Sequence, residues 1–370
     1  PDWRAQPHAP ALPAPDAIDT LRDRLTAAQR PLIVAGGMFD VPGGRAALRR
    51  LAEHWQCPVV VSFRRQDLFP NAHPLYAGDL GLANPKAQID AFRRSDLILA
   101  LGTRHGDISS QGFAFPELPM PAQTLVHCYP DPDVVGRHFA AEFGLVCDAP
   151  ALARALCTGT PQPPRPDWCG TLRALYEGIA AWPRRTPSDG IDFNDVVRAL
   201  HRHAPDDLIM TVDAGTFAVP VYRHVAWRPP QRLMAPLAGA MGYGVPAAIA
   251  AQLRHPQRRV VCLVGDGGFM MTGNEMIAAV ERALPILFVL SNNASYASIR
   301  IHQEREYPGR HRGTGLFNPD FTALAAAFGM RSQRLDDPAA VDATVADLMA
   351  SRTPAFLEVR TSLQAVLPAR

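Results

Sequence analysis

Residues 260–268 read Val-Val-Cys-Leu-Val-Gly-Asp-Gly-Gly, and residues 286–293 read Ile-Leu-Phe-Val-Leu-Ser-Asn-Asn. Each stretch is an apolar run that ends in glycine or polar residues, which is typical of a buried β-strand followed by a loop. Between them, Thr272-Gly-Asn-Glu275 has the pattern of a helix capping box, and a helix is expected over 276–284 because Pro285 ends it. The three elements predict a βαβ unit, in which two parallel strands end at the same edge of a sheet.

The same alternation of apolar strands and helical segments extends over most of the chain. We expect strands at 31–37, 58–62, 96–102 and 124–128 in the first half, and at 207–212, 259–264, 286–290 and 355–359 in the second. Parallel strands need helical crossovers, which cover both faces of the sheet. The predicted fold class is therefore α/β, with two Rossmann-like, doubly wound domains whose sheets are mainly parallel. A chain of 370 residues is long enough for two hydrophobic cores.

Two proline-rich stretches interrupt this pattern. The first 15 residues contain five prolines and are typical of a linker, so we expect another segment to precede Pro1. The second stretch lies at 158–166. We therefore divide the chain into a linker at 1–15, a central Rossmann-like domain at 16–157, an interdomain linker at 158–190 and a second domain at 191–370.

The composition excludes several classes of function. The chain has 37 basic and 35 acidic residues and no basic run, so nucleic acid is not an expected partner. Lys86 is the only lysine and lies in a polar, proline-flanked stretch, which argues against pyridoxal enzymes, Schiff-base aldolases and Walker A loops. The six cysteines form no CxxC pair, which favours a reducing cytoplasm over a zinc ribbon or a disulfide scaffold. No apolar stretch approaches the roughly 20 residues that span a bilayer, so no membrane association is expected.

Polar residues follow both strands of the βαβ unit at the points where the strands end. Asp266 comes directly after the first strand, and Asn293 follows the second. Two oxygen ligands at one sheet edge suit a hard cation such as Mg²⁺ or Ca²⁺, which also takes phosphate oxygens. Gly265, Gly267 and Gly268 would let a diphosphate approach backbone N–H groups. The sequence therefore predicts a metal-bridged diphosphate at this edge.

The span from Gly265-Asp-Gly267 across 24 intervening residues to Asn292-Asn293 resembles the signature of thiamine diphosphate (ThDP) enzymes. The resemblance implies that Asp266, Asn293 and the backbone oxygen of Ser295 hold Mg²⁺. It continues through residues 296–310, a run that is similar to acetolactate synthase-like proteins, and it covers essentially the whole chain.

The resemblance also implies a set of cofactor-binding residues. Residues 237–246 resemble the segment beneath the aminopyrimidine ring, where the Gly239 carbonyl would accept a hydrogen bond from the 4′-amino group and Met241 would bend the cofactor. Residues 213–217 resemble a loop that seats the diphosphate. The implied cofactor-binding residues are Gly215, Thr216, Phe217, Gly239, Met241, Gly265, Gly267, Gly268, Tyr296, Ala297 and Ser298.

The implied activity is decarboxylation of a 2-keto acid, or transfer of a carbon unit from it, with the thiazolium ring of ThDP as the electron sink. In the family, the glutamate that activates ThDP lies in an N-terminal pyrimidine-binding domain, and no segment here resembles that domain. We therefore assign no catalytic residue in this chain with certainty. We expect that activity requires a pyrimidine-domain partner, and that the protein forms a homo- or hetero-oligomer of two or four subunits.

Two segments depart from the family pattern. His302 stands where acetohydroxyacid synthases have a tryptophan. His302 and Glu304 are candidates for a general acid or base. A solvated helix face that includes both residues is an equal alternative. Residues 101–107 resemble a loop that contacts FAD or ADP, without the fuller Arg-Phe-Asp-Asp-Arg pattern. Gly102 and Arg104 are candidate nucleotide contacts. For His105, contact with substrate or nucleotide is one alternative, and a loop histidine with satisfied hydrogen bonds is the expected one.

Two other functions remain open at this point. A non-catalytic ThDP- or nucleotide-binding regulatory subunit would result from loss of the glutamate-bearing domain. A nicotinamide dehydrogenase is disfavoured, because neither Rossmann-like unit has a GxGxxG motif with an acidic residue at the right distance.

Overall fold

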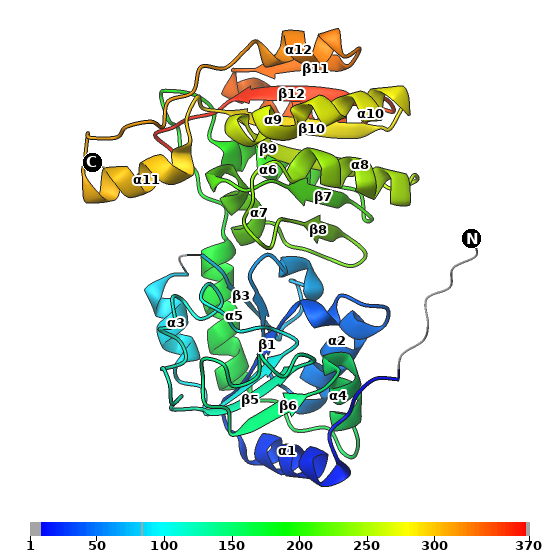
Figure 1. Cartoon of the computed structure of the whole chain (residues 1–370), viewed down its shortest axis with the longest axis vertical. Helices are drawn as coiled ribbons and strands as arrows, with labels where there is room; N and C mark the ends of the chain where they lie inside the picture. Colours follow the sequence, from blue (N-terminus) through cyan, green and yellow to red (C-terminus); the bar gives the residue numbers. More distant parts are fainter. Residues whose placement is uncertain (1–8, 83, 368–370) are drawn as a thin grey trace. The chain divides into compact units, whose positions relative to one another are not determined.

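A computed structural model describes residues 9–82 and 84–367 of the chain (Figure 1). Two six-stranded sheets form its framework, and every strand pairing in them is parallel. Helices cover both faces of each sheet, as the hydrophobic clusters below indicate. The predicted α/β class with two doubly wound, Rossmann-like domains is therefore confirmed.

The first sheet has the strand order β3-β2-β1-β4-β5-β6. Its chain order changes direction between β1 and β4, which is the topological switch point of a Rossmann-type sheet. The strands are β1 (Pro31–Ala35), β2 (Val59–Ser62), β3 (Tyr76–Leu80), β4 (Leu97–Leu101), β5 (Thr124–Tyr129) and β6 (Phe143–Val146). Two short 3₁₀ helices, η1 (Gly37–Phe39) and η2 (Gln66–Leu68), follow β1 and β2.

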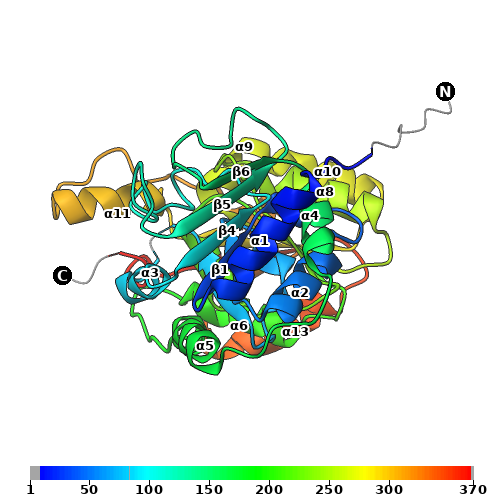
Figure 2. The ribbon, with the colours of Figure 1, turned by 90° about the horizontal axis from the view of Figure 1, so that it is seen from below.

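The helices of the first sheet divide between its faces according to their apolar residues. One cluster joins Leu21, Leu48 and Leu152, from α1 (Pro15–Ala27), α2 (Gly44–Trp55) and α4 (Ala149–Leu156), to one face of the strands. Figure 2 shows these three helices together on that side. The opposite cluster contains Phe92 of α3 (Lys86–Phe92) and Trp168 of α5 (Pro166–Ala180).

The second sheet has the strand order β11-β12-β10-β9-β7-β8. The strands are β7 (Ile209–Val212), β8 (Arg232–Met234), β9 (Val260–Gly265), β10 (Ile286–Asn292), β11 (Arg331–Leu335) and β12 (Ala355–Arg360). On one face lie α6 (Phe193–Arg202), α7 (Val219–Arg223) and α13 (Val341–Met349). On the other lie α8 (Gly244–Arg254), α9 (Asp266–Thr272), α10 (Met276–Glu281) and α12 (Phe321–Ala327). Helix α11 (Ala297–Glu306) follows β10, and three 3₁₀ helices complete the set, η3 (Thr216–Ala218), η4 (Gly273–Glu275) and η5 (Pro338–Ala340).

The predicted capping box at 272–275 is wrong. Helix α9 begins at Asp266, immediately after β9, and Thr272 lies at its end. The Thr272 hydroxyl donates to the Gly242 carbonyl at 2.9 Å and so caps no helix. Residues 273–275 form η4, and the helix expected over 276–284 ends at Glu281. The crossover from β9 to β10 thus contains two helices, and the βαβ arrangement itself is as predicted.

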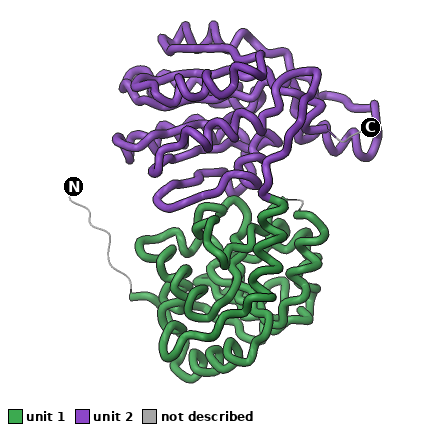
Figure 3. Tube along the Cα trace, turned by 180° about the vertical axis from the view of Figure 1, so that it is seen from behind, with its two compact units in different colours: residues 1–179 green, residues 180–370 purple. Residues whose placement is uncertain are grey.

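The chain divides into two compact units, residues 1–179 (unit 1) and 180–370 (unit 2) (Figure 3). The stretch expected as an interdomain linker, 158–190, is not irregular throughout, because it contains the 15-residue helix α5. Trp168 and Leu172 of α5 are buried in the unit 1 core, so this helix packs as part of that unit. Part of the linker expected at 1–15 lies outside the described residues, and residues 9–14 form no helix or strand. Within the described ranges, no helix combines the length and apolar character needed to cross a membrane.

Candidate cofactor and metal site

A pocket lies at the carboxyl ends of β7, β9 and β10 in unit 2. Because β9 and β10 are parallel neighbours, with Gly265 opposite Ser291, the residues that follow them come together at this edge. The pocket is lined by Ala214, Gly215, Thr216, Phe217, Met241, Gly265, Asp266, Gly267, Gly268, Ser291, Asn293, Ser295, Tyr296, Ala297, Ser298 and Ile299.

Asp213 fastens two of the segments that form the pocket. It follows β7 and is fully buried. Its carboxylate accepts hydrogen bonds from the Ala214 N–H at 2.6 Å and from the Gly242 N–H at 3.0 Å. Burial raises the pKa of Asp213, and the backbone N–H donors oppose that rise. The carboxylate therefore joins the loop after β7 to the loop that contains Met241.

Among the described residues that line the pocket, Asp266 supplies the only carboxylate. Its side chain is buried, with Oδ1 accepting from the Gly267 N–H and Oδ2 from the Asn318 amide, both at 2.9 Å. Burial raises the pKa of Asp266, while the hydrogen bond from Asn318 and nearby backbone N–H groups lower it. A bound cation would stabilise the ionised carboxylate that burial disfavours.

Two further residues with oxygen atoms that could bind a metal ion follow β10. The Asn293 side-chain oxygen accepts from the Ser295 N–H at 3.1 Å, which holds the loop in a tight turn. The Ser295 hydroxyl donates to the Thr314 carbonyl at 3.0 Å. Asp266, Asn293 and Ser295 all line the pocket. A carboxylate, an amide oxygen and a backbone oxygen form the all-oxygen set that Mg²⁺ prefers, so these residues fit the ion.

The glycines of the pocket are required by close packing against its aromatic walls. A Cβ at Gly267 would lie 2.4 Å from the Tyr296 ring, and one at Gly265 would lie 3.0 Å from the Phe217 ring. A Cβ at Gly268 would lie 2.8 Å from an Asp213 oxygen. The Gly-Asp-Gly-Gly sequence therefore lets the β9–α9 junction pack directly against the neighbouring loops.

The structure brings most of the predicted cofactor residues together. Ten of the eleven lie in the pocket lining, together with the three predicted metal-binding residues. The exception is Gly239, which is exposed in the turn where its N–H donates to the Pro236 carbonyl at 2.9 Å. Gly239 has a φ of +75°, so the turn requires glycine for conformational reasons.

His302 and Glu304 lie on α11 and are not part of the pocket lining. His302 is exposed, whereas Glu304 is buried and accepts a hydrogen bond from the Gly309 N–H at 2.9 Å. The other Glu304 oxygen lies 2.9 Å from Nδ1 of His311. Glu304 thus holds the loop after α11, and an acid–base role for either residue stays a prediction.

The two candidate nucleotide contacts lie in unit 1, after β4 at the switch point of the first sheet. Gly102 has a φ of +64°, and a Cβ there would lie 2.7 Å from the Met38 side chain. Arg104 is exposed, and its Nε lies 3.3 Å from the Tyr129 hydroxyl. His105 is 1% exposed, and neither ring nitrogen has a hydrogen-bond partner in the described structure. The expectation that the hydrogen bonds of His105 are satisfied is therefore wrong.

Sequence reasoning missed Asn318 and Glu358, which lie behind the candidate metal site. Asn318 donates to Asp266 and, at 3.0 Å, to the Asn292 side-chain oxygen. The Asn292 amide in turn donates to buried Glu358 at 2.7 Å. Asn318 lies in a loop whose composition resembles any polar turn, so its pattern contained no signal.

This arrangement is that of an α/β cofactor-binding protein whose site lies at the carboxyl ends of parallel strands. Comparison with known families defines it further. Residues 213–359 match the family described as thiamine pyrophosphate enzyme, C-terminal TPP binding domain, and residues 18–156 match thiamine pyrophosphate enzyme, central domain. Thiamine pyrophosphate is another name for ThDP. The chain belongs to the ThDP enzymes, of which it contains the central and C-terminal domains.

Curated relatives point to one branch of this family. The chain is 29% identical over 345 residues to the acetolactate synthase isozyme 2 large subunit of Escherichia coli, covering 92% of this chain and 62% of that protein. It is 29% identical over 361 residues to the acetolactate synthase large subunit of Parasynechococcus marenigrum, covering 95% and 57%. It is 26% identical over 366 residues to the mitochondrial acetolactate synthase catalytic subunit of Saccharomyces cerevisiae, covering 95% and 53%. The chain thus spans between 53% and 62% of the length of these relatives.

Proposed function

We propose that this chain is the cofactor-binding part of an acetolactate synthase-like enzyme that decarboxylates a 2-keto acid and transfers the remaining carbon unit. The observation that supports this most directly is the convergence of Asp266, Asn293 and Ser295 in one glycine-lined pocket of a ThDP-enzyme domain. When bound, ThDP supplies the electron sink for loss of CO₂.

The chain's own residues would bind and shield the cofactor. Asp266, the Asn293 side chain and the Ser295 backbone oxygen would hold Mg²⁺, which would bridge to the diphosphate. Phe217, Tyr296 and Met241 line the same pocket and would exclude water from it.

We further propose that a pyrimidine-binding domain or chain covers this site in a dimer or tetramer. Apolar side chains around the pocket support a partner: Met241 and Ile299 line it and remain 36% and 53% exposed. Met270 and Met271 of α9 are 56% and 52% exposed. Contiguous exposed apolar surface, unlike single exposed apolar residues, is typical of interaction surfaces.

Cofactor binding tests the first proposal. Calorimetric titration of ThDP with Mg²⁺ into the full chain should give saturable binding that Asp266→Asn and Asn293→Ala weaken at least about tenfold, because the first removes the negative charge of a metal ligand and the second removes a ligand. Asn274→Ala, an exposed asparagine of the same unit, should bind like the wild type. Equal binding by all four proteins would exclude the assigned metal site.

Activity separates an enzyme from a regulatory subunit. The alternative, a non-catalytic ThDP-binding subunit, gains support from the pocket lining, where Asp266 is the only carboxylate among the residues that the structure describes. Adding a pyrimidine-domain partner and pyruvate should produce CO₂ if the chain is catalytic. Binding of ThDP without CO₂ release in that mixture would favour the regulatory subunit.

For unit 1, we propose that a nucleotide such as ADP or FAD binds at the switch point after β4. Gly102 and Arg104 lie there, and open α/β sheets bind ligands at this position. After dialysis against FAD or ADP, the wild type should retain bound nucleotide and Arg104→Gln should retain less.

We also propose a cytoplasmic location, which the six free cysteines support.

A further inference from the structure

A second cavity, of about 380 Å³, lies at the amino ends of the unit 2 strands, whereas the cofactor pocket lies at their carboxyl ends. Its lining comes from segments that directly precede the strands β7, β9, β10 and β12. The lining residues are His203, Pro205, Asp207, Pro256, Gln257, Arg258, Arg259, Pro285, Met349, Ala350, Ser351 and Arg352. We call it the arginine cavity, because Arg258, Arg259 and Arg352 supply most of its charge.

Asp207 is the one acidic residue among the lining residues, against three arginines. In the described parts of the chain, none of the three arginines forms an ion pair with a carboxylate. Burial and the charge of Arg352 lower the pKa of Arg259 to about 10. Burial is the main cause that lowers the pKa of Arg258; the Asp207 charge opposes this effect, and the Arg232 charge adds to it. The cavity therefore has three positive charges against the single negative charge of Asp207 among its described lining residues.

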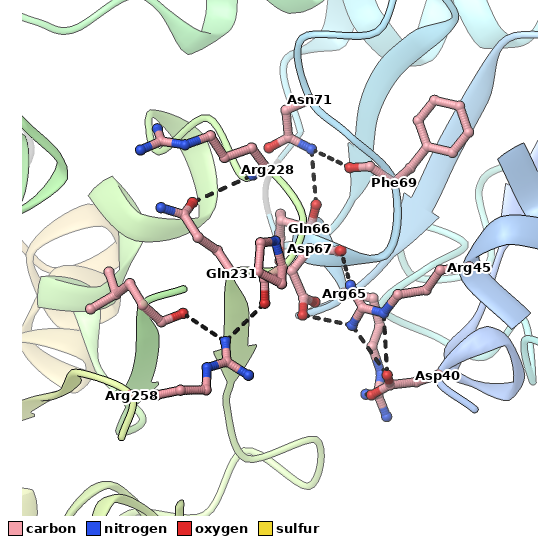
Figure 4. A network of polar contacts seen from close by, with 12 residues as sticks. Asp40, Arg45, Arg65, Gln66, Asp67, Phe69, Asn71, Arg228, Gln231 and Arg258 are labelled. Carbon is pink, nitrogen blue, oxygen red and sulfur yellow. Dashed lines mark hydrogen bonds and ion pairs between the residues drawn. The ribbon is translucent and has the colours of Figure 1, made fainter. Parts of the chain in front are cut away.

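Backbone oxygens fix two of the guanidinium groups in place. Arg259 donates to the Pro285 carbonyl at 2.6 Å, to Ser351 at 3.0 Å and to Leu348 at 2.8 Å. Arg258 donates to the Asp207 carbonyl at 2.7 Å and to the Pro230 carbonyl at 2.8 Å. Figure 4 labels Arg258 and marks hydrogen bonds of its guanidinium group with dashed lines. Carbonyl oxygens are neutral acceptors, so they orient these groups without neutralising their charge.

Arg258 and Arg259 donate to backbone carbonyls near the ends of strands and helices, and this structural role explains their positions. Arg352 has no such role. Arg352 is exposed and lines the same cavity with no polar contact in the described structure. Ordered arginines beside a free one form a site that is organised before a ligand arrives, which reduces the entropy lost on binding. Guanidinium groups bind phosphate and carboxylate oxygens through paired hydrogen bonds.

We propose that the arginine cavity binds a small organic anion with two or more negative charges, held through phosphate or carboxylate groups by Arg258 and Arg352. A volume of about 380 Å³ exceeds the need of a single inorganic ion and is within the range of small-molecule pockets. This site is separate from the ThDP pocket and does not depend on the proposed enzyme activity.

Calorimetric titration of the full chain with citrate and, separately, with inorganic phosphate tests the proposal. The protein is first passed over a metal-chelating resin, so that no divalent ion supports anion binding at Asp266 and no soluble chelator competes for the arginine cavity. Citrate or phosphate should bind saturably, and Arg352→Gln should weaken binding roughly tenfold, because a charge-assisted contact is lost. Stronger binding of citrate would assign carboxylate groups to the ligand, and stronger binding of phosphate would assign phosphate groups.

Arg154→Gln is the matched control, since it removes another exposed arginine, from unit 1. It should change the dissociation constant by less than about twofold. Arg352 makes no polar contact, so Arg352→Gln should unfold at the wild-type temperature, and Arg258→Gln provides a second variant. The proposal is overturned if neither anion binds the wild type, or if Arg352→Gln and Arg258→Gln bind as Arg154→Gln does.

Discussion

The side-chain amide of Asn318 donates a hydrogen bond to the Asp266 carboxylate at 2.9 Å. The same amide nitrogen lies 3.0 Å from the Asn292 side-chain oxygen, so Asn318 bridges the residues that follow β9 and those that end β10. Behind it, Glu358 accepts from Asn292 at 2.7 Å and from Arg334 at 3.0 Å. The two loops of the candidate metal site are therefore held at a fixed separation by a polar network that does not itself line the pocket.

Replacing Asn318 with alanine should weaken Mg²⁺-dependent ThDP binding by about 10- to 100-fold, which is the usual effect of losing a partner that orients a metal ligand. The Asp266 carboxylate would lose one of its two positioned donors and could rotate away from the metal. Calorimetry, or electron paramagnetic resonance with Mn²⁺ as the probe ion, measures this directly. Asn274→Ala serves as the control. Unchanged Mn²⁺ affinity in Asn318→Ala would show that the bridge does not orient Asp266.

The sequence predicted the interior of both sheets and missed their edges. All eight expected strands are present, and the four that were not expected are β3, β6, β8 and β11, which are the edge strands. Interior parallel strands are buried on both faces and appear as continuous apolar runs. An edge strand such as β11, Arg-Ser-Gln-Arg-Leu, is partly exposed and needs no such run. Its pairing with β12 is decided by tertiary contact rather than local composition.

The same division applies to the site. Asp266 and Asn293 could be predicted because each directly follows an apolar strand, and neighbouring parallel strands place such residues together. Asn318 reaches Asp266 across 52 residues of chain, and no local pattern encodes that contact. The capping box was misassigned for a related reason, since the Thr272 hydroxyl donates to Gly242, a residue 30 positions away.

Replacing Gly267 with alanine should distort the pocket. The new methyl group would lie 2.4 Å from the Tyr296 ring, so the ring or the helix must move. Overpacking of this kind costs about 1–3 kcal/mol, which exceeds the gain of up to about 1 kcal/mol from better helix propensity. We expect a lower free energy of unfolding and weaker ThDP binding, measured by urea denaturation and calorimetry. A more stable Gly267→Ala protein with normal ThDP affinity would contradict the packing role of this glycine.

Gly170 is the opposite case, and its replacement by alanine should stabilise unit 1. It is exposed within α5, has no special backbone conformation, and a Cβ there would meet nothing within 4 Å. The gain should be about 0.5–1 kcal/mol, since alanine loses less backbone entropy than glycine in a helix. Urea denaturation of the full chain measures it. A destabilised Gly170→Ala protein would mean that α5 is not a helix at this position.

Burial of His105 should make the protein sensitive to acid. Desolvation, together with the neighbouring His127 and His138, lowers the pKa of His105 to about 3, whereas an unfolded histidine titrates near 6.5. Above pH 6.5 the residue is neutral in both states and contributes no pH dependence. Between pH 6.5 and 3 the unfolded chain binds a proton that the folded chain excludes, so stability falls as the pH falls through this range.

At pH 4.5 this residue should cost the folded state about 2–3 kcal/mol relative to pH 7, since each pH unit below the unfolded pKa contributes about 1.4 kcal/mol. Leucine at position 105 cannot titrate. Between pH 7 and pH 4.5, the unfolding free energy of His105→Leu should therefore fall about 2–3 kcal/mol less than that of the wild type. His127, His201 and His224, whose pKa values are also lowered by burial, are present in both proteins, so the comparison isolates position 105. Urea denaturation at the two pH values is the measurement. If both proteins lose the same stability on acidification, His105 does not remain neutral in the folded chain.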